Sequence, residues 1–164
     1  MIPGFGGFQA QSIQPVEIDA STPFMAAADG DLTLLQTSIK QLNLSANIID
    51  SNGFTLLHAA CGYCRIDVIN WLLDLNNNES TLIDVNARDS DNDTPLHHCD
   101  DVDSARILIE KGGADHQLTN NEGKTPLQSK EAELEEEDDD DDSDGDEDRE
   151  KLKQLVVYLK SLSV

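Results

Sequence analysis

One short motif recurs four times along the chain and sets the strongest limit on its fold. Each copy begins with threonine: Thr22-Pro23-Phe24-Met25, Thr55-Leu56-Leu57-His58, Thr94-Pro95-Leu96-His97 and Thr125-Pro126-Leu127-Gln128. The four threonines are 33, 39 and 31 residues apart. A period of this length indicates a row of small units, each of which buries its apolar side against its neighbours.

The repeating unit is predicted to be a helix–turn–helix. Threonine is a favoured N-cap residue, and proline suits the first turn of a helix, where its missing N–H has no helical partner. In the second copy the motif continues into Ala59-Ala60-Cys61. An apolar stripe with helical spacing follows, formed by Ile66, Val68, Ile69, Leu72 and Leu73. Trp71 lies beside this stripe, and we expect it to pack against the core.

The motif and its period resemble the ankyrin-repeat family, and the resemblance covers almost all of residues 19–164. It implies an all-α ankyrin-repeat solenoid of about four helix–turn–helix repeats with short β-hairpin fingers. It also implies that His58 and His97 bond to the backbone of the preceding loop and so join the repeats. Met25 and Gln128 occupy the same position in the terminal repeats, where neither side chain reproduces this role fully.

The resemblance also places one left-handed turn position in each finger. Gly53 and Gly123 fit this position, and Asn92 replaces glycine in the third repeat. Asparagine tolerates a positive φ better than other non-glycine residues do. The resemblance also places Cys64 at a position where a turn glycine is usual.

Three repeats depart from the regular pattern. Five polar residues, 76–80, lengthen the second repeat and predict a bulging loop. Only residues 98–104 separate the third motif from the next apolar stripe, so its first helix should be short or its turn tight. In the fourth repeat an acidic run separates the motif from an amphipathic helix, which we expect to close the stack as a C-terminal cap. Its apolar side is Leu152, Leu155, Val156 and Leu159.

These features divide the chain into four parts. Residues 1–19 are expected to form an extended N-terminal arm. Residues 20–130 contain ankyrin repeats 1–3 and the first half of repeat 4. Residues 131–150 are read as a disordered acidic insertion, and residues 151–164 as the C-terminal capping helix of repeat 4.

Negative charge is concentrated in the predicted insertion. The whole chain carries −22; residues 131–150 contribute fifteen acids and one arginine, or −14, which leaves −8 elsewhere. Such a run repels phosphate backbones, so we expect no direct nucleic-acid binding, and its natural complement is a basic protein. Ser143 lies within the run and is a phosphorylation candidate. The acidic segment proper consists of Glu135, Glu136, Glu137, Asp138, Asp139, Asp140, Asp141, Asp142, Asp144, Asp146, Glu147 and Asp148.

The sequence also bears on compartment and assembly. No signal peptide and no apolar run of about 18 residues is visible, so neither secretion nor membrane insertion is expected. Three cysteines cannot all pair within one chain, and we expect them to be reduced. We therefore expect a monomer located in the cytoplasm, the nucleus or both.

Three short patterns carry possible chemistry, and the repeats explain each of them. Residues 61–64 form a C-x-x-C, which is a redox motif in a thioredoxin-like setting, but no βαβ pattern surrounds it. Residues 97–100, His-His-Cys-Asp, have metal-ligand composition, yet neighbours along a helix do not face one point. Residues 89–93 resemble a calcium loop that lacks its glycine and distal glutamate. We expect no catalytic residues, no cofactor, no metal and no enzymatic activity.

In the ankyrin family the fingers and first helices line a concave face that binds proteins. By position, the candidate contacts here are Asn52, Phe54, Ala59, Gly62, Tyr63, Arg88, Asp91, Asp93, Asn121, Glu122 and Lys124. Phe54 and Tyr63 are the expected anchors, because aromatic residues dominate interface energies.

Two functional hypotheses follow. The chain is an adaptor or chaperone-like binder of a basic protein, using this face together with the acidic segment. This architecture is similar to that of small fungal ankyrin proteins with acidic tails, some of which escort ribosomal proteins. Alternatively, it is a scaffold or inhibitor that binds a non-basic protein through the face alone, with the acidic segment serving solubility.

Overall fold

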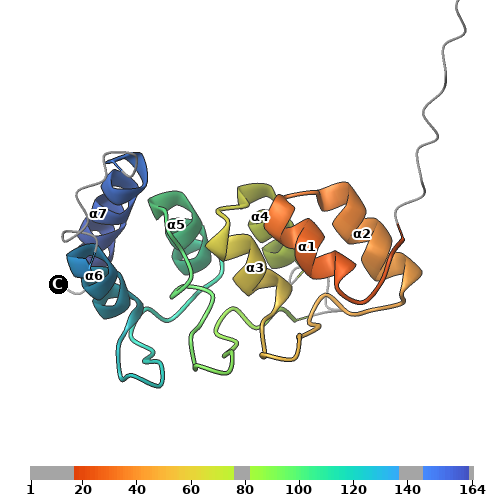
Figure 1. Cartoon of the computed structure of the whole chain (residues 1–164), viewed down its shortest axis with the longest axis horizontal. Helices are drawn as coiled ribbons and strands as arrows, with labels where there is room; N and C mark the ends of the chain where they lie inside the picture. The colour runs from red at the N-terminus through yellow and green to blue at the C-terminus, as the bar shows by residue number, and fades with distance from the viewer. Residues whose placement is uncertain (1–16, 76–81, 137–145, 163–164) are drawn as a thin grey trace, which may run out of the picture.

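The described part of the chain folds into three helix pairs and one single helix, arranged in one row (Figure 1). The computed structural model describes residues 17–75, 82–136 and 146–162. Within these residues there are seven helices: α1 (Thr22–Asp29), α2 (Leu32–Gln41), α3 (Leu56–Gly62), α4 (Ile66–Leu75), α5 (Val102–Glu110), α6 (Pro126–Glu136) and α7 (Asp146–Ser161). The loops that join successive pairs project from one side of the row, at the bottom of Figure 1. The expected all-α repeat fold is confirmed, although the third repeat contributes α5 alone.

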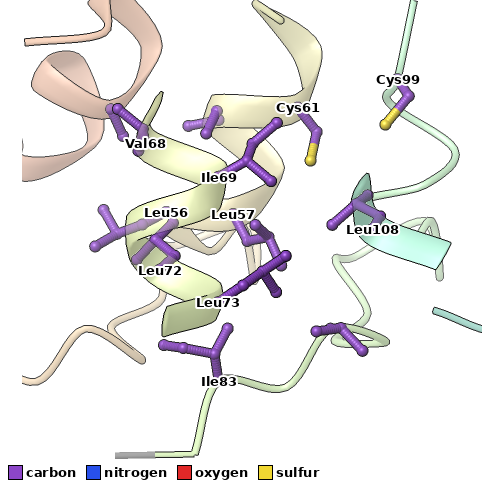
Figure 2. Packing of buried hydrophobic residues seen from close by; sticks show 14 of the residues in the cluster. Leu56, Leu57, Cys61, Val68, Ile69, Leu72, Leu73, Ile83, Cys99 and Leu108 are labelled. Carbon is purple, nitrogen blue, oxygen red and sulfur yellow. The ribbon is translucent and has the colours of Figure 1, made fainter. Parts of the chain in front are cut away.

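A continuous apolar core runs between the helices of neighbouring repeats. Leu56, Leu57, Ile69 and Leu72 from α3 and α4 are at most 1% exposed, and Leu108 of α5 packs against the same cluster (Figure 2). Trp71 is partly buried against this core, as its place beside the stripe predicted. Because each repeat contributes only a few such side chains, the core forms only when the repeats stack.

The third repeat lacks a first helix. After Thr94 the chain makes only a tight turn, in which His97, His98 and Cys99 donate their N–H groups to carbonyls three residues earlier. Asp101 then caps α5, because its carboxylate accepts from the N–H groups of Asp103 and Ser104. The predicted shortening is therefore confirmed, and one turn with i→i+3 bonds replaces the helix.

The fourth repeat is completed by α6 and α7, which pack against each other, and α7 also packs against α5. Both helices extend into the segment predicted to be an insertion: α6 continues to Glu136, and α7 begins at Asp146 rather than at Lys151. Acidic residues favour the first turn of a helix because of its dipole, and Lys151 pairs with Glu147 at 3.1 Å. The acidic residues between these helices, 137–145, lie outside the described residues, as do the N-terminal arm up to residue 16 and the polar loop of residues 76–81.

The apolar side of α7 is buried, as its amphipathic pattern predicted. Leu152, Leu155, Val156 and Leu159 are at most 5% exposed, whereas Val157 on the other side is 68% exposed. The guanidinium of Arg106, from α5, lies 5.4 Å from the centre of the Tyr158 ring. Helix α7 therefore packs as the second helix of the fourth repeat, and its role as a C-terminal cap stays a prediction.

Candidate partner-binding face

Two buried histidines join neighbouring repeats. The Nδ1 atom of His58 lies 3.1 Å from the Thr55 backbone nitrogen, and its Nε2 atom lies 3.1 Å from the Asp93 carbonyl oxygen. Because an N–H group can only donate, Nδ1 is the acceptor and Nε2 carries the proton. His97 repeats the arrangement with Thr94 and the Lys124 carbonyl. Burial lowers the pKa of both imidazoles, which favours their neutral forms.

The direction of these histidine bonds differs from the expectation. Each Nε2 bonds to the loop of the following repeat, Asp93 for His58 and Lys124 for His97, and not to the preceding loop. The bond to the preceding segment is the local one to threonine, made by Nδ1. In the last repeat Gln128 reproduces only that local half, since its side-chain oxygen accepts from the Thr125 N–H at 3.0 Å.

Each finger is held by one side chain at its base, a device that the sequence analysis did not identify. A single oxygen of Asp50, Asp89 or Asn120 accepts two backbone N–H groups of its own loop, two and four residues later. Three residues after each of these side chains lies the turn residue with the predicted positive φ: Gly53, Asn92 and Gly123. The signal was present in the sequence as an Asp or Asn three residues before each turn residue. The fingers are tight loops of this kind, and Ile49–Thr55 is an isolated bridge within the first.

We expect Asp89→Ala to lower the free energy of unfolding by about 1–2 kcal/mol, since it leaves two N–H groups without their acceptor. Its other oxygen also accepts from His98 Nε2 at 3.0 Å, and the side chain is only 6% exposed. Urea unfolding measures the change. Asp91→Ala is the matched control in the same finger, where the side chain is exposed; an equal loss in both variants would contradict the assignment.

Four of the predicted contact residues lie at the exposed tips of the fingers, where each also makes a hydrogen bond to a neighbouring finger: Asn52, Arg88, Asp91 and Asn121. The Asn52 carbonyl accepts from the Ser90 N–H, and the Asp91 carbonyl accepts from the Asn121 N–H. Arg88 donates to the carbonyl of Thr119 at 2.8 Å. These bonds fix the spacing of the three fingers, so the tips present one continuous edge.

The predicted helix contacts divide into buried and exposed residues. Ala59 is only 5% exposed, and Gly62 is half-buried. The Phe54 ring packs between His58 and His98, with ring centres 5.0 and 4.9 Å away, so it covers the histidine that joins two repeats. Tyr63, at the end of α3, is 61% exposed. Of the two expected anchors, Tyr63 offers the larger free surface.

Asp93, Glu122 and Lys124 come together in an open recess of about 290 Å³ between the third and fourth repeats. The sequence analysis did not include six further lining residues: His97, His98, Asn120, Ser129, Ala132 and Glu133. The last three lie on α6, and the sequence analysis did not predict that this helix lines the recess. They approach the third repeat where that repeat lacks a first helix.

Lys130 of α6 fills part of the space beside the shortened third repeat. Its side chain is 6% exposed, and its ammonium lies 2.6 Å from Asp100 and 2.9 Å from Glu133. Burial by itself lowers the pKa of Lys130, but the bonds to the two carboxylates outweigh it and hold the pKa above its usual value. The charge of Lys130 is therefore retained and is balanced by its two partners.

One histidine and acid cluster lies next to the recess. Ligand atoms of His58, Asp89 and His98 lie within 4.8 Å of one another. His58 Nε2 already donates to a carbonyl, and His98 Nε2 bonds to Asp89. Within the cluster, therefore, a cation would have to displace the bond that joins the second and third repeats.

The cysteines are poorly suited to thiol chemistry. Cys61 and Cys99 are fully buried and lie between the second and third repeats (Figure 2). Contact with Cys61, together with burial, raises the pKa of Cys99. Burial also raises the pKa of the Cys64 thiol to about 12. The backbone of Cys64 has the positive φ expected of a residue that replaces the turn glycine. Redox activity requires an easily formed thiolate, and the raised pKa values of Cys64 and Cys99 oppose it.

Part of the acidic segment belongs to the described helices. The side chains of Glu135, Glu147 and Asp148 are exposed. Glu136 ends α6 and Asp146 begins α7. The remaining members, Glu137, the run Asp138–Asp142, Asp144 and the phosphorylation candidate Ser143, lie outside the described residues. No described helix is long and apolar enough to cross a bilayer.

Comparisons with known proteins agree with this geometry. The family described as ankyrin repeats (many copies) matches residues 24–73. An ankyrin repeat-containing protein of Schizosaccharomyces pombe is 34% identical over 119 residues, covering 70% of this chain and 53% of that protein.

Two further relatives match over shorter stretches. An IkB-like protein of African swine fever virus is 30% identical over 105 residues, covering 60% of this chain and 44% of that protein. The mouse ankyrin repeat and MYND domain-containing protein 1 is 32% identical over 85 residues, covering 52% of this chain and 9% of that protein. The chain thus spans about half the length of the yeast relative and less of the other two. Its four motifs, its histidine-joined helix pairs and these matches show that it belongs to the ankyrin-repeat family.

Proposed function

We propose that the chain is a non-catalytic adaptor or chaperone-like binder of a basic protein. It uses the concave face lined by its fingers and first helices, together with the acidic segment. Ankyrin repeats serve protein–protein interaction, so the partner is expected to be a protein. The observation that supports a basic partner is charge. The chain has a net charge of −22, and residues 131–150 account for −14 of it.

The described part of the face supports the same partner class. Three carboxylates and one ammonium line the recess between the third and fourth repeats, so the charges of these four side chains sum to −3 + 1 = −2. Helices α6 and α7 frame the acidic run, and α6 also lines this recess. A basic partner seated on the face would therefore lie within the field of both acidic regions.

The test compares the full chain with a variant in which residues 137–145 are replaced by serine and glycine at equal length, which removes seven acids and keeps both flanking helices. Binding of a lysine- and arginine-rich peptide is measured by fluorescence anisotropy from about 50 to 300 mM salt. We expect tight binding by the full chain that weakens steeply with salt, and weaker, less salt-dependent binding by the variant. Equal affinity and equal salt dependence would contradict a role for the acidic segment.

The alternative is a scaffold or inhibitor that binds a non-basic protein through the face alone. The exposed aromatic side chain of Tyr63 supports it, because such residues are common anchors of protein interfaces. Affinity capture with the full chain, the serine–glycine variant and a Tyr63→Ala variant distinguishes the hypotheses. Partners lost with the serine–glycine variant are held by charge, whereas partners retained by it but lost with Tyr63→Ala are held by the face.

A further inference from the structure

The recess between the third and fourth repeats exists because one helix is missing. In the second repeat α3 has seven residues, whereas the corresponding part of the third repeat ends after a single turn at Cys99. Helix α6 is long, with 11 residues, and faces a neighbour that is shorter than itself. Lys130 fills part of the resulting space, and about 290 Å³ remains open.

The size of the recess suits one side chain. Sites for whole small-molecule ligands enclose about 300–1,000 Å³, so this recess lies at the lower limit of that range. It is also open to solvent, and Glu122 and Lys124 from the last finger are among its lining residues. A side chain that projects from a partner can enter it without rearrangement of the repeats.

The lining of the recess favours a cation. Asp93 and Glu133 contribute carboxylates from the third and fourth repeats, and Glu122 contributes a third from the last finger. Glu122 pairs with Lys124 at 2.8 Å, and Glu133 shares the single ammonium of Lys130 with Asp100. The Asp93 carboxylate accepts a neutral donor, the Asn120 amide, at 2.9 Å, so no full positive charge balances it there. His97, which is 3.8 Å from Asp93, is kept neutral by burial, which lowers its pKa.

One polar atom of the wall is without a partner. The Ser129 hydroxyl oxygen is buried and makes no hydrogen bond within the described residues. Buried hydroxyl groups are nearly always hydrogen-bonded, so an orphaned one in the wall of a recess points to a missing donor or acceptor. It lies on α6, the helix that also contributes Glu133.

We propose that this recess binds one arginine side chain of the basic partner, with Asp93 and Glu133 accepting from its guanidinium. The Ser129 hydroxyl accepts another of its N–H groups after the Ser129 side chain rotates toward the recess, because its oxygen is buried in the unbound chain. This inference rests on the proposed function and specifies the group that is recognised. Arginine is favoured over lysine because a guanidinium presents five donors in a planar fork, whereas an ammonium presents three at one point. Asp93 and Glu133 lie on two different segments, so a group with several donors can bond to both.

The test is an NMR titration of the ¹⁵N-labelled chain with the capped peptide Gly-Arg-Gly. Gly-citrulline-Gly is the neutral analogue of the same shape, and Gly-Lys-Gly is the cationic alternative. We expect saturable shifts at the amides of Asn120, Ser129 and Ala132 with the arginine peptide, and none with the citrulline peptide. The lysine peptide should bind at least about threefold more weakly. Equal shifts with citrulline, equal affinity for lysine, or shifts elsewhere on the surface would each overturn the assignment.

A matched pair of variants tests the same proposal through the dissociation constant of the arginine peptide. Glu133→Gln removes one charge and keeps an oxygen for Lys130, so the fold is preserved and the dissociation constant of the arginine peptide should rise about tenfold. Glu110→Gln makes the same charge change on α5, where the side chain is 65% exposed, and should leave the constant unchanged. Equal effects of the two variants would overturn the proposal.

Failure of this proposal is distinguishable from failure of the proposed function. If the recess does not bind arginine, the salt-dependent binding of a lysine- and arginine-rich peptide by the acidic segment remains, and the serine–glycine replacement of residues 137–145 still weakens it. If the proposed function fails, the full chain and the serine–glycine variant bind that peptide equally, whatever the NMR titration shows.

Discussion

Replacement of Leu155 by alanine should lower the free energy of unfolding by about 3–4 kcal/mol. Leu155 is fully buried in α7 and belongs to the main apolar cluster. Deleting its side chain removes buried apolar surface and leaves a cavity that rigid neighbouring helices cannot fill. Urea unfolding followed by far-ultraviolet circular dichroism measures the loss. A change of this size is a large part of the stability of a small domain.

Val157→Ala is the matched control for this prediction. Val157 lies in the same helix two residues later, but its side chain is 68% exposed. Its replacement should change stability by less than about 0.5 kcal/mol, as is usual for surface positions. Similar losses in the two variants would mean that α7 has no buried side, and the role of α7 as a cap would be wrong.

The second large effect is expected at the histidine that joins the second and third repeats. His58→Ala should cost about 2–4 kcal/mol, because it empties a fully buried site and removes the bonds to Thr55 and to the Asp93 carbonyl. Thermal or urea unfolding at pH 7.5 measures this loss. If the variant were as stable as the parent chain, His58 could not be the link between the repeats.

The same variant should change how stability depends on pH. Burial lowers the pKa of His58 in the folded chain, so below about pH 6.5 the unfolded chain binds a proton that the folded chain does not. Stability due to the neutral imidazole is therefore complete above this pH and falls as the pH falls. Each such histidine contributes a slope of at most about 1.4 kcal/mol per pH unit.

His97 has a lowered pKa for the same reason, so the parent chain should show the combined slope of two histidines between about pH 7 and 5.5. His58→Ala should remove about half of it. The measurement is the free energy of unfolding at pH 7.5, 6.5 and 5.5 for both proteins. A parent chain whose stability is constant or rises as the pH falls across this window would contradict the neutral, buried state of the two imidazoles.

Most of the fold follows from short-range patterns in the sequence. The four threonine motifs predict where the repeats begin, because threonine and proline specify helix starts by local geometry. The seven residues after His97 are too few for a helix and a turn, which predicts the shortened third repeat. The spacing of Leu152, Leu155 and Leu159 predicts the buried side of α7.

The helix bounds near the acidic run were harder to predict from local charge. Clustered acids suggest an insertion from Glu131 onward, yet α6 continues to Glu136. Glutamate is a good helix former, and Lys160 of α7 lies 2.7 Å from Glu131, so a contact between distant segments supports the extra turns. Such a contact is invisible in the order of residues.

The candidate site was predicted only in part, for a similar reason. Positions in the repeat identify Asp93, Glu122 and Lys124 as facing one side, and the structure places them around one recess. The contribution of Ser129 and Glu133 depends on how α6 fills the space beside a missing helix. Likewise, the distances between fingers decide that Arg88 bonds to Thr119. Both depend on packing between repeats, which sequence spacing does not specify.

The most direct test of the account asks whether one stack runs through the helix-poor third repeat. Trp71 is the only tryptophan and lies in α4, in the second repeat, whereas Leu155 lies in α7, in the fourth. Urea unfolding of Leu155→Ala is followed by Trp71 fluorescence and by circular dichroism. We predict that both transitions shift together to lower urea than in the parent chain. A fluorescence midpoint unchanged from that of the parent, with helix lost at lower urea, would show that the two halves fold separately and would contradict the account.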